Sequence, residues 1–238
     1  MIQVEGIFVS GGSDISVPII GEDFNWSGGD GTYQVLDDGG GNWRIKFLSS
    51  GTFTPLKNMV IDVFLVGGGG GAGSSYCGEG GAGYTTTVRS VVLTANTAYS
   101  IVVGAAGTNG NPSSAGGETT AFTASAAGGK NTSNGTSSSK RPGGAGGSGG
   151  AGYVSPVATT TGGTDGGDGT DSATAGGKGQ GTTTREFGEA DGTLYASGGG
   201  SNLSATVANS GNGGRNGITS IAPADGIVVI RQHKEVAA

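Results

Sequence analysis

An apolar run that passes directly into a run of glycine constrains the fold of this chain most strongly. Met59–Val66 is rich in β-branched and aromatic residues and is interrupted only by Asp62, a pattern typical of a buried β-strand. The next five residues, Gly67–Gly71, have no side chains to bury. Such a backbone needs hydrogen bonds from neighbouring segments, because it cannot form a hydrophobic core of its own. We therefore expect glycine-rich segments that are held on a conventional β scaffold.

The composition favours a folded chain over a flexible glycine linker, although the linker is the main alternative. Glycine accounts for 55 of 238 residues, a content close to that of low-complexity chains. Only 13% of the residues are charged, however, and the Val, Ile, Phe and Tyr residues gather in short runs, which is unlike disordered segments. The net charge of −6 and the lack of a basic run argue against a nucleic-acid partner. No apolar run approaches the ~20 residues of a membrane span, so we expect no membrane insertion.

Short β-strands are predicted along the chain, and no helical period is sustained for three turns. The hairpin signal is strongest at Asp37–Gly41, which Tyr33–Leu36 and Asn42–Leu48 flank. In the second of these strands, Trp43, Ile45 and Phe47 share one apolar face. Further strands are predicted at residues 3–9, 15–20, 88–93, 99–103 and 226–231, with 88–93 paired to 99–103. The chain divides into an N-terminal β region, 1–56, which we expect to contact a neighbouring chain, and a glycine-rich domain, 57–238.

Two glycine tracts have a period of three residues, which is neither helix nor pleated strand. Gly143–Gly152 places Ala145, Ser148 and Ala151 in one column, and Thr164–Asp171 keeps the same period. Three residues per turn is the geometry of polyproline II, whose amides must bond to neighbouring chains. We predict an all-β fold in which a small antiparallel β-sandwich is combined with a layer of stacked polyglycine II helices. The columns that carry Ala, Ser or Asp are expected to face solvent or the rim of the stack. The glycines assigned to this structural role are Gly67, Gly68, Gly69, Gly70, Gly71, Gly143, Gly144, Gly146, Gly147, Gly149, Gly150, Gly163, Gly166 and Gly169.

The acidic column of the second tract gives no basis for a calcium site. Asp165, Asp168 and Asp171 would lie ~9.3 Å apart along one edge, too far for two carboxylates to share an ion. We expect a solvated acidic ridge and no metal.

Catalytic chemistry is not expected either. The only histidine, His233, predicts no triad and no zinc cluster, and Cys77 is expected to be inert. No phosphate-binding loop motif is present, so no cofactor is predicted. In the polar segment 179–189, Arg185 is expected to bond structurally to carboxylates or to glycine carbonyls, with Glu186 and Glu189 as neighbouring acidic groups.

The ordered set of motifs resembles the glycine-rich domain of phage and prophage tail proteins. The motifs are Asn42–Pro55, Ile61–Gly71, Gly80–Tyr84, Tyr99–Gly104, Gly179–Gly188, Gly192–Gly198 and Gly226–Arg231. More distantly, the chain is similar to the adhesins that tip the long tail fibres of T-even-type phages. The resemblance implies a tail-fibre or tail-tip protein of the virion, assembled in the host cytoplasm, with no enzymatic activity. Its implied partners are other tail, fibre or baseplate proteins and a host-surface glycan or protein, in a homotrimer or as a cap on a trimeric fibre.

Loops that join the glycine-rich segments carry the varied side chains that recognition of a glycan or protein requires. Rigid Tyr side chains beside adaptable polar groups suit this purpose. The candidate receptor-binding residues are Tyr76, Asn109, Asn111, Asn131, Tyr153 and Asn202. Two alternatives remain open: a purely structural tail component without receptor contact, and an ice-binding protein built on polyglycine II. Against ice binding, Thr does not recur along one column of either repeat.

Overall fold

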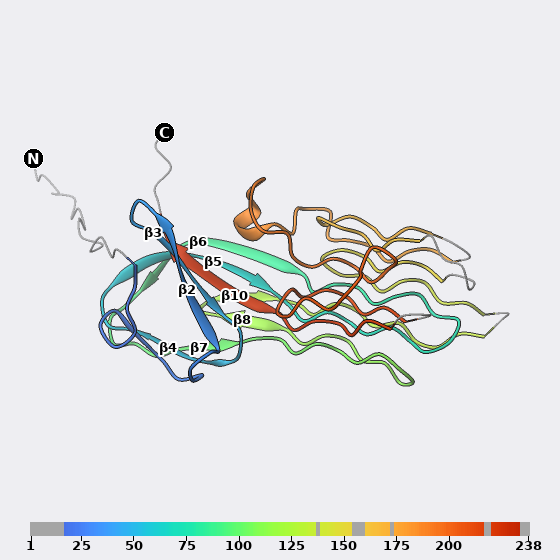
Figure 1. The fold of residues 1–238 in the computed structure, drawn as a ribbon, viewed down its shortest axis with the longest axis horizontal. Coiled ribbons are helices and arrows are strands. Elements are labelled where there is room, and N and C mark those ends of the chain that lie inside the picture. The colour runs from blue at the N-terminus through green and yellow to red at the C-terminus, as the bar shows by residue number, and fades with distance from the viewer. Residues whose placement is uncertain (1–16, 137–138, 154–159, 172–173, 217–219, 234–238) are drawn as a thin grey trace, which may run out of the picture.

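The computed structural model describes residues 17–136, 139–153, 160–171, 174–216 and 220–233. In this part of the chain the fold is all-β, with two antiparallel sheets and one turn of 3₁₀ helix, η1 (Glu186–Gly188), as Figure 1 shows. One sheet contains, in spatial order, β1 (Phe24–Trp26), β4 (Gly51–Pro55), β7 (Tyr99–Val102), β8 (Thr119–Ala121) and β9 (Ala124–Ala126). The other contains β2 (Tyr33–Gly39), β3 (Asn42–Phe47), β10 (Ile227–Gln232), β5 (Met59–Val66) and β6 (Thr85–Leu93).

The two sheets pack face to face over an apolar core. In β3 burial alternates as the sequence predicts, so that Trp43, Ile45 and Phe47 are buried between the sheets. Phe53 of β4 meets Phe47 from the opposite sheet at 5.5 Å between ring centroids, in an edge-on arrangement. The predicted β-sandwich is therefore confirmed.

Strand β5 is buried on both of its faces, which explains its nearly continuous apolar run. Ile61, Val63 and Leu65 point into the sandwich core, whereas Phe64 and Val66 belong to a second apolar cluster on the outer face. That second cluster also contains Ala82, Phe187, Tyr195, Ala196, Ile227 and Val229. The glycine-rich part of the chain thus covers the outer face of the sheet.

Several strand predictions are confirmed, and one predicted pairing is wrong. The hairpin of β2 and β3 forms across residues 39–42, and the last predicted strand appears as β10. Segments 88–93 and 99–103 do not pair with each other, because β6 pairs with β5 while β7 pairs with β4 and β8 in the other sheet. The predicted strand at 3–9 and the first part of the one at 15–20 lie outside the described residues; Ile20 makes only an isolated bridge to Phe24.

The boundary predicted at residue 56 does not separate two structural units. Strands β1 and β4 share a sheet with β7–β9, and β2 and β3 share the other with β5, β6 and β10. Strand β10, which comes last along the chain, lies between β3 and β5. The two predicted domains therefore build one sandwich together.

Beyond the sandwich, the strands continue as glycine-rich segments that run side by side (Figure 1). These segments extend the sheets in one direction and give the molecule an elongated shape. They are 67–72 after β5, 79–84 before β6, 103–110 after β7, 114–118 before β8, 127–132 after β9 and 221–226 before β10. We call this half of the molecule, with the later described segments 139–153, 160–171 and 174–216, the glycine array.

Backbone hydrogen bonds in the glycine array repeat every three residues. The amides of Gly67 and Gly70 donate to one neighbouring segment, at Tyr84 and Gly81 (3.0 and 2.8 Å). The amides of Gly68 and Gly71 donate to a second, at Gly117 and Ser114 (3.0 and 2.9 Å), and that of Gly69 donates to a third, at Ala224 (2.9 Å). Carbonyls of the same run accept from Gly107 and Gly110, from Gly129 and Thr132, and from Gly214. Among the described residues, 67–72 thus bonds to six surrounding segments, whereas a β-strand bonds only to one on each side.

This pattern has the period and the lateral contacts that a stack of threefold helices requires. Backbone approach is so close that side chains are excluded: a Cβ atom added to Gly69 would lie 1.9 Å from the carbonyl oxygen of Asn212, and one added to Gly71 would lie 1.9 Å from that of Thr108. The polyglycine II geometry of the individual segments stays a prediction, which the hydrogen-bond period favours.

Both period-three tracts fold back on themselves, although the three-residue period continues through each turn in the sequence. Gly144 and Gly147 donate to Glu79 and Ala82 in parallel, whereas Ser148 and Ala151 accept from Ala82 and Glu79 in the antiparallel sense. The chain therefore reverses between residues 147 and 148. In the second tract it turns at Asp165–Gly166, where φ is +52° and +82°.

The prediction that the Ala and Ser column faces solvent or the rim of the stack is wrong at two positions. Ser148 and Ala151 are 0% exposed, because the folded-back run is enclosed by other segments. Ser148 Oγ accepts a hydrogen bond from the Gly166 amide at 3.1 Å. The acidic column, Asp165, Asp168 and Asp171, is exposed.

Candidate functional site

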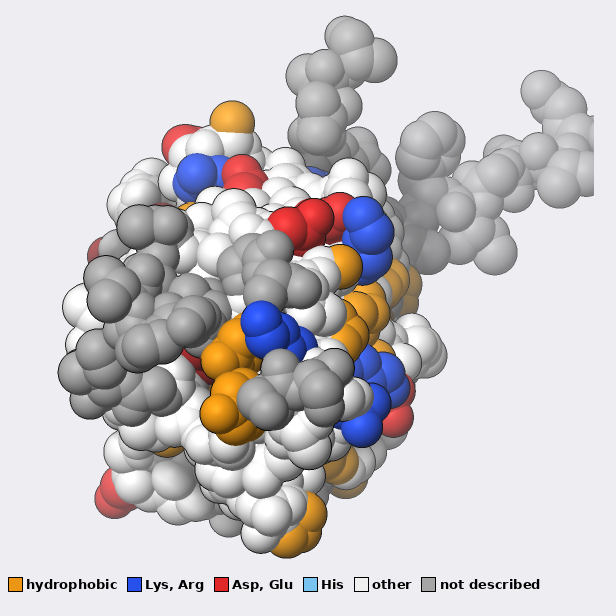
Figure 2. Space-filling model, turned by 90° about the vertical axis from the view of Figure 1, so that its right-hand side faces the viewer, with side chains coloured by type: hydrophobic (Ala, Val, Ile, Leu, Met, Phe, Trp, Pro, Cys, Tyr) orange, Lys and Arg blue, Asp and Glu red, His pale blue; other side chains and the backbone are white. Residues whose placement is uncertain are grey.

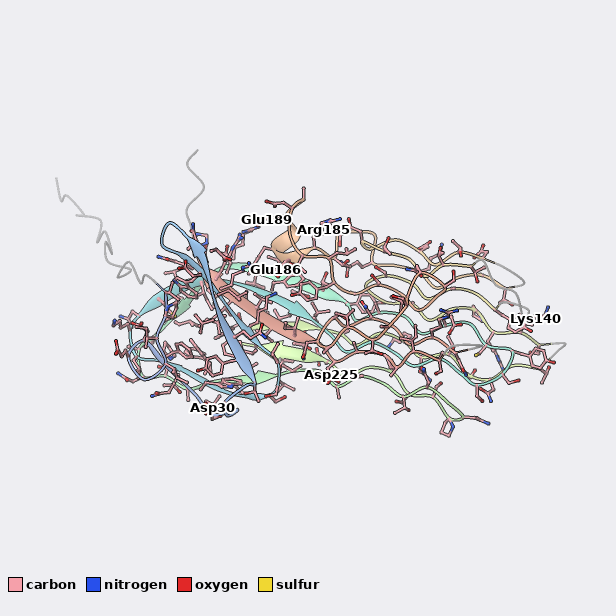
Figure 3. All side chains as sticks on the ribbon, in the orientation of Figure 1. Asp30, Lys140, Arg185, Glu186, Glu189 and Asp225 are labelled. Carbon is pink, nitrogen blue, oxygen red and sulfur yellow. The ribbon has the colours of Figure 1, made fainter. Side chains whose placement is uncertain are left out.

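The end of the glycine array farthest from the sandwich brings together two of the predicted receptor-binding residues. The rings of Tyr76 and Tyr153 lie 5.6 Å apart between centroids, with their planes inclined by 32°. The Lys140 ammonium is 5.1 Å from the centroid of the Tyr153 ring, within range of a cation–π contact. Lys140 is labelled in Figure 3, at the extremity opposite the sandwich. We call Tyr76, Tyr153, Lys140 and the adjacent exposed Arg141 the distal tip.

Hydrogen bonds from neighbouring segments hold the turn that presents Tyr76. Thr132 Oγ1 accepts from the Gly73 amide at 3.0 Å and donates to the Gly78 carbonyl at 2.6 Å, so it ties together the two ends of the turn. Asn134 Oδ1 accepts from the Ser74 amide at 2.6 Å. Tyr76 itself has φ +46° and is 41% exposed. The ring is therefore presented to solvent by a turn with fixed ends.

The surface around the distal tip combines apolar and basic groups. Figure 2, which looks directly onto this end, shows hydrophobic side chains beside Lys and Arg side chains.

Next to Tyr76, burial raises the pKa of the Cys77 thiol to about 11, with a further contribution from the charge of Glu79. Cys77 is thus a protonated thiol at neutral pH.

The predicted asparagines occupy different environments from the two tyrosines. Asn109 Oδ1 accepts from the Ala72 amide at 2.8 Å while its Nδ2 donates to the carbonyls of Arg215 and Ile221. Asn202 Oδ1 accepts from the Gly162 amide at 2.8 Å, and Asn131 Nδ2 donates to the Ser113 carbonyl at 3.0 Å. The side-chain amide groups of these three asparagines bond to the backbone of the array, whereas the side chain of Asn111 is exposed.

A second polar region lies on the outer face of the β2–β3–β10–β5–β6 sheet, beside η1. An open cleft of about 750 Å³ there is lined by Asp38, Asn42, Trp43, Arg44, Arg89, Glu186, Phe187, Glu189, Asp191, Gly192, Arg231 and Gln232. Its charges are paired across the sheet: Glu186, 3% exposed, accepts from Arg44 at 2.6 Å. Glu189 accepts two hydrogen bonds from Arg231, at 2.7 and 2.9 Å, which lower its pKa.

The three polar residues expected together in segment 179–189 bond to different partners. Arg185 Nε donates to Asp165 at 3.2 Å, and its Nη1 donates to the Gly192 carbonyl at 3.1 Å. Glu186 and Glu189 instead pair with Arg44 and Arg231 of the sheet. Figure 3 labels the three side chains around η1. Arg185 thus bonds within the glycine array, while the two glutamates attach η1 to the sandwich.

Polar contacts of His233 connect the end of β10 to β5 and β6. His233 follows β10, and its ring contacts Asp62 of β5 and Ser90 of β6, at 2.6 Å and 2.9 Å respectively. Asp62 is the residue that interrupts the apolar run of β5, and this polar break was the available signal in the sequence. Ser90 gave none, since it is one of many serines in the chain.

A family model, described as a glycine-rich domain, matches residues 48–231. The chain belongs to the glycine-rich domain family. The match begins just before β4 and ends within β10, so this glycine-rich domain includes most of the sandwich together with the array. A comparison with curated proteins found no match.

Within the described part of this glycine-rich domain, His, Cys, Asp and Glu side chains form no group of three or more that is placed to hold a metal ion. The same part of the chain contains no helix with the length and apolar character needed to cross a bilayer.

Proposed function

We propose that this glycine-rich domain is a rigid recognition module of a phage or prophage tail, which contacts a host-surface glycan or protein through its distal tip. The observation that carries this proposal is the Tyr76–Tyr153 pair with Lys140 over it, at the extremity opposite the sandwich. Aromatic rings of this kind provide a flat apolar face on which sugar rings or apolar side chains pack. The basic groups beside them favour a ligand that carries negative charge.

The glycine array is suited to hold this tip at a fixed distance from an attachment point. Its segments are cross-linked by backbone hydrogen bonds in several lateral directions, and it continues directly from the strands of the sandwich. The sandwich end is then the part that joins other tail, fibre or baseplate proteins. A homotrimer, or a cap on a trimeric fibre, is the assembly that the resemblance to tail proteins favours.

Binding to intact cells tests this proposal directly. A fluorescent fusion of the full chain is incubated with a panel of bacterial strains, and a strain that binds is used to compare variants. Tyr76→Ala and Tyr153→Ala are each expected to weaken binding about tenfold or more, as for other aromatic anchors at interfaces. Val92→Ala is the control, because Val92 is 71% exposed in β6, in the sandwich half of the molecule.

Two results would contradict the proposal. One is unchanged cell binding by a folded Tyr76→Ala/Tyr153→Ala double variant. The other is thermal hysteresis by the wild-type chain at micromolar concentration, which would support the ice-binding alternative instead. Loss of binding in the Val92→Ala variant alone would move the recognition surface to the sandwich.

A further inference from the structure

The charges of this chain are distributed unevenly along the molecule. The whole chain carries a net charge of −6, yet residues 119–164 contain no Asp or Glu and include Lys130, Lys140 and Arg141. Figure 3 shows Lys140 at the extremity opposite the sandwich and Asp30, an exposed carboxylate, in the sandwich half. A negatively charged ligand is therefore attracted to the distal tip, although the chain as a whole is acidic.

The two cations of the distal tip are available to a ligand. Other exposed cations of the chain are paired: Lys57 with Asp23 and Lys178 with Asp168, both at 2.6 Å. Lys140 and Arg141 are also exposed, but within the described part of the chain neither forms an ion pair with a carboxylate. Their positive charge is thus not neutralised by a described acidic group.

Hydrogen bonds of the backbone place these cations beside the aromatic rings. The Arg141 amide donates to the Tyr76 carbonyl at 3.2 Å, so the segment with both cations lies against the turn that presents Tyr76. Arg141 Nε donates to the Asn134 carbonyl at 3.4 Å, and the Lys140 ammonium lies 5.1 Å from the centre of the Tyr153 ring. Charge and aromatic surface therefore form one site.

Glu79 holds the segments of this site in register. Its amide donates to Ala151, two residues before Tyr153, and its carbonyl accepts from Gly144, in the segment that follows the two cations, both at 2.8 Å. The Glu79 carboxyl group bonds to the Asn216 amide at 2.6 Å and forms no ion pair with the tip cations. The site is thus built from three segments that are joined at one backbone position.

The small residues around the rings favour a sugar over a protein as the ligand. Ser74, Ser75 and Ser139 are exposed, and their hydroxyl groups can donate to and accept from the hydroxyl groups of a saccharide. Tyr76 is the one large apolar side chain in the exposed part of its turn, residues 74–76. A protein interface has a broader apolar core, whereas one aromatic face is sufficient for a sugar ring.

We propose that the distal tip binds a phosphorylated saccharide, with the sugar on the aromatic pair and the phosphate between Lys140 and Arg141. This assignment depends on the recognition role proposed above for the tip. Two adjacent cations match a phosphate monoester, which carries nearly two negative charges at neutral pH, better than they match a carboxylate with one. The guanidinium also pairs with phosphate through two parallel hydrogen bonds.

A titration followed by NMR tests the ligand class on the full chain. Glucose 6-phosphate, glucuronate and glucose are added separately at equal ionic strength, and the amides of Gly78, Gly143 and Gly144 report on the tip. We expect shifts at these amides with glucose 6-phosphate, about tenfold weaker binding of glucuronate, and none of glucose at the same concentrations.

Charge variants complete this test. Lys140→Gln and Arg141→Gln are each expected to weaken binding of glucose 6-phosphate about tenfold. Lys130→Gln is the matched control, because it removes an exposed cation of the same array outside the tip and changes the net charge equally. The inference is overturned if glucose 6-phosphate shifts no tip amide, if glucose or glucuronate binds as tightly, or if Lys130→Gln weakens binding as much as Lys140→Gln.

The cell-binding assay separates failure of this inference from failure of the proposed function. Both are supported if Tyr76→Ala and the Lys140→Gln/Arg141→Gln double variant weaken cell binding, while Lys130→Gln does not. If Tyr76→Ala weakens binding and the double variant, shown to be folded by thermal unfolding, does not, the recognition role stands and the phosphate ligand is wrong. If the Tyr76→Ala/Tyr153→Ala variant binds cells as wild type does, the recognition role itself is wrong, whatever the titration shows.

Discussion

At the scale of single residues, side-chain oxygens complete the backbone hydrogen bonding of the glycine array at its rim. Asp168 Oδ1 accepts from the Gly179 amide at 2.8 Å, and Asp171 Oδ1 accepts from the Gly176 amide at 2.5 Å. Both the acceptors and the donors are three residues apart, so the acidic column bonds to an amide column of the neighbouring segment. The carboxylates that were expected to form a solvated ridge therefore also accept hydrogen bonds from backbone amides at the edge of the array. The side-chain oxygens of Asn109 and Asn202 do the same elsewhere.

Glu79 is a carboxyl group that the array keeps away from water. Burial raises its pKa from 4.5 to about 7, although the Asn216 amide donates to Oε2 at 2.6 Å and Arg215 contributes a favourable charge. Because the folded state binds this proton more tightly than the unfolded state, its contribution to stability is present below pH 4.5 and is lost as the pH rises through about 7.

Replacing Glu79 by Gln should remove this dependence on pH. The amide oxygen can still accept from Asn216, but it carries no charge at any pH. We expect the melting temperature of Glu79→Gln to exceed that of wild type at pH 8 and to approach it at pH 4.5. Thermal unfolding across this range measures the difference, with Glu118→Gln, at an exposed carboxylate, as the control. An equal change at both pH values would show that folding does not shift the pKa of Glu79.

At the scale of elements, the sequence predicts strands with large side chains well and chain reversals poorly. β5 and the β2–β3 hairpin were identified because apolar periodicity and the turn at Asp37–Gly41 are strong local signals. β8 and β9 were missed, since they are three residues each and rich in Thr and Ala. The reversal between residues 147 and 148 was missed because a glycine repeat continues unchanged through the turn. Periodicity shows which edges other backbones can approach but not where the chain changes direction.

The candidate site and the polar contacts of His233 depend still more on long-range packing. Tyr76 and Tyr153 were selected for their chemistry, yet nothing local shows that their rings meet. Ser90 and His233 are 143 residues apart, and only the register shift between β5 and β6 brings them to the same carboxylate. Asp62 alone gave a local signal, as a charge in a buried strand.

Close backbone packing in the glycine array predicts unequal costs for glycine substitutions. In Gly69→Ala the new Cβ would lie 1.9 Å from the Asn212 carbonyl oxygen, so two backbones must separate. We expect a loss of about 3 kcal/mol or more in the free energy of unfolding, at the upper end for overpacked sites. In Gly167→Ala the nearest atom is 3.1 Å away, and a change within about 1 kcal/mol is expected. Urea denaturation compares the two, and similar losses would contradict the close packing at Gly69.

At the scale of the whole molecule, the sandwich and the glycine array share strands and an apolar cluster. β5 contributes Ile61, Val63 and Leu65 to one core and Phe64 and Val66 to the other before it continues as Gly67. The ion pairs of Glu186 with Arg44 and of Glu189 with Arg231 add a second connection through η1. Loss of order in either half therefore exposes groups that the other half covers, and we expect one cooperative unit.

Phe64→Ala tests this coupling. Phe64 is 1% exposed and lies 5.5 Å from Tyr195 and 5.9 Å from Phe187 between ring centroids, so its truncation should cost about 3–5 kcal/mol. Fluorescence of the core tryptophans reports on the sandwich, and exchange of glycine amides, measured by NMR, reports on the array. Because the cluster joins both halves, the variant should reduce the free energy of unfolding by the same amount whichever probe is used. The two transitions should have coincident midpoints in denaturant. If the glycine amides lost protection while the tryptophan transition stayed at its wild-type midpoint, the array would be a separate unit, and the fixed spacing of the distal tip from the sandwich would lose its physical basis.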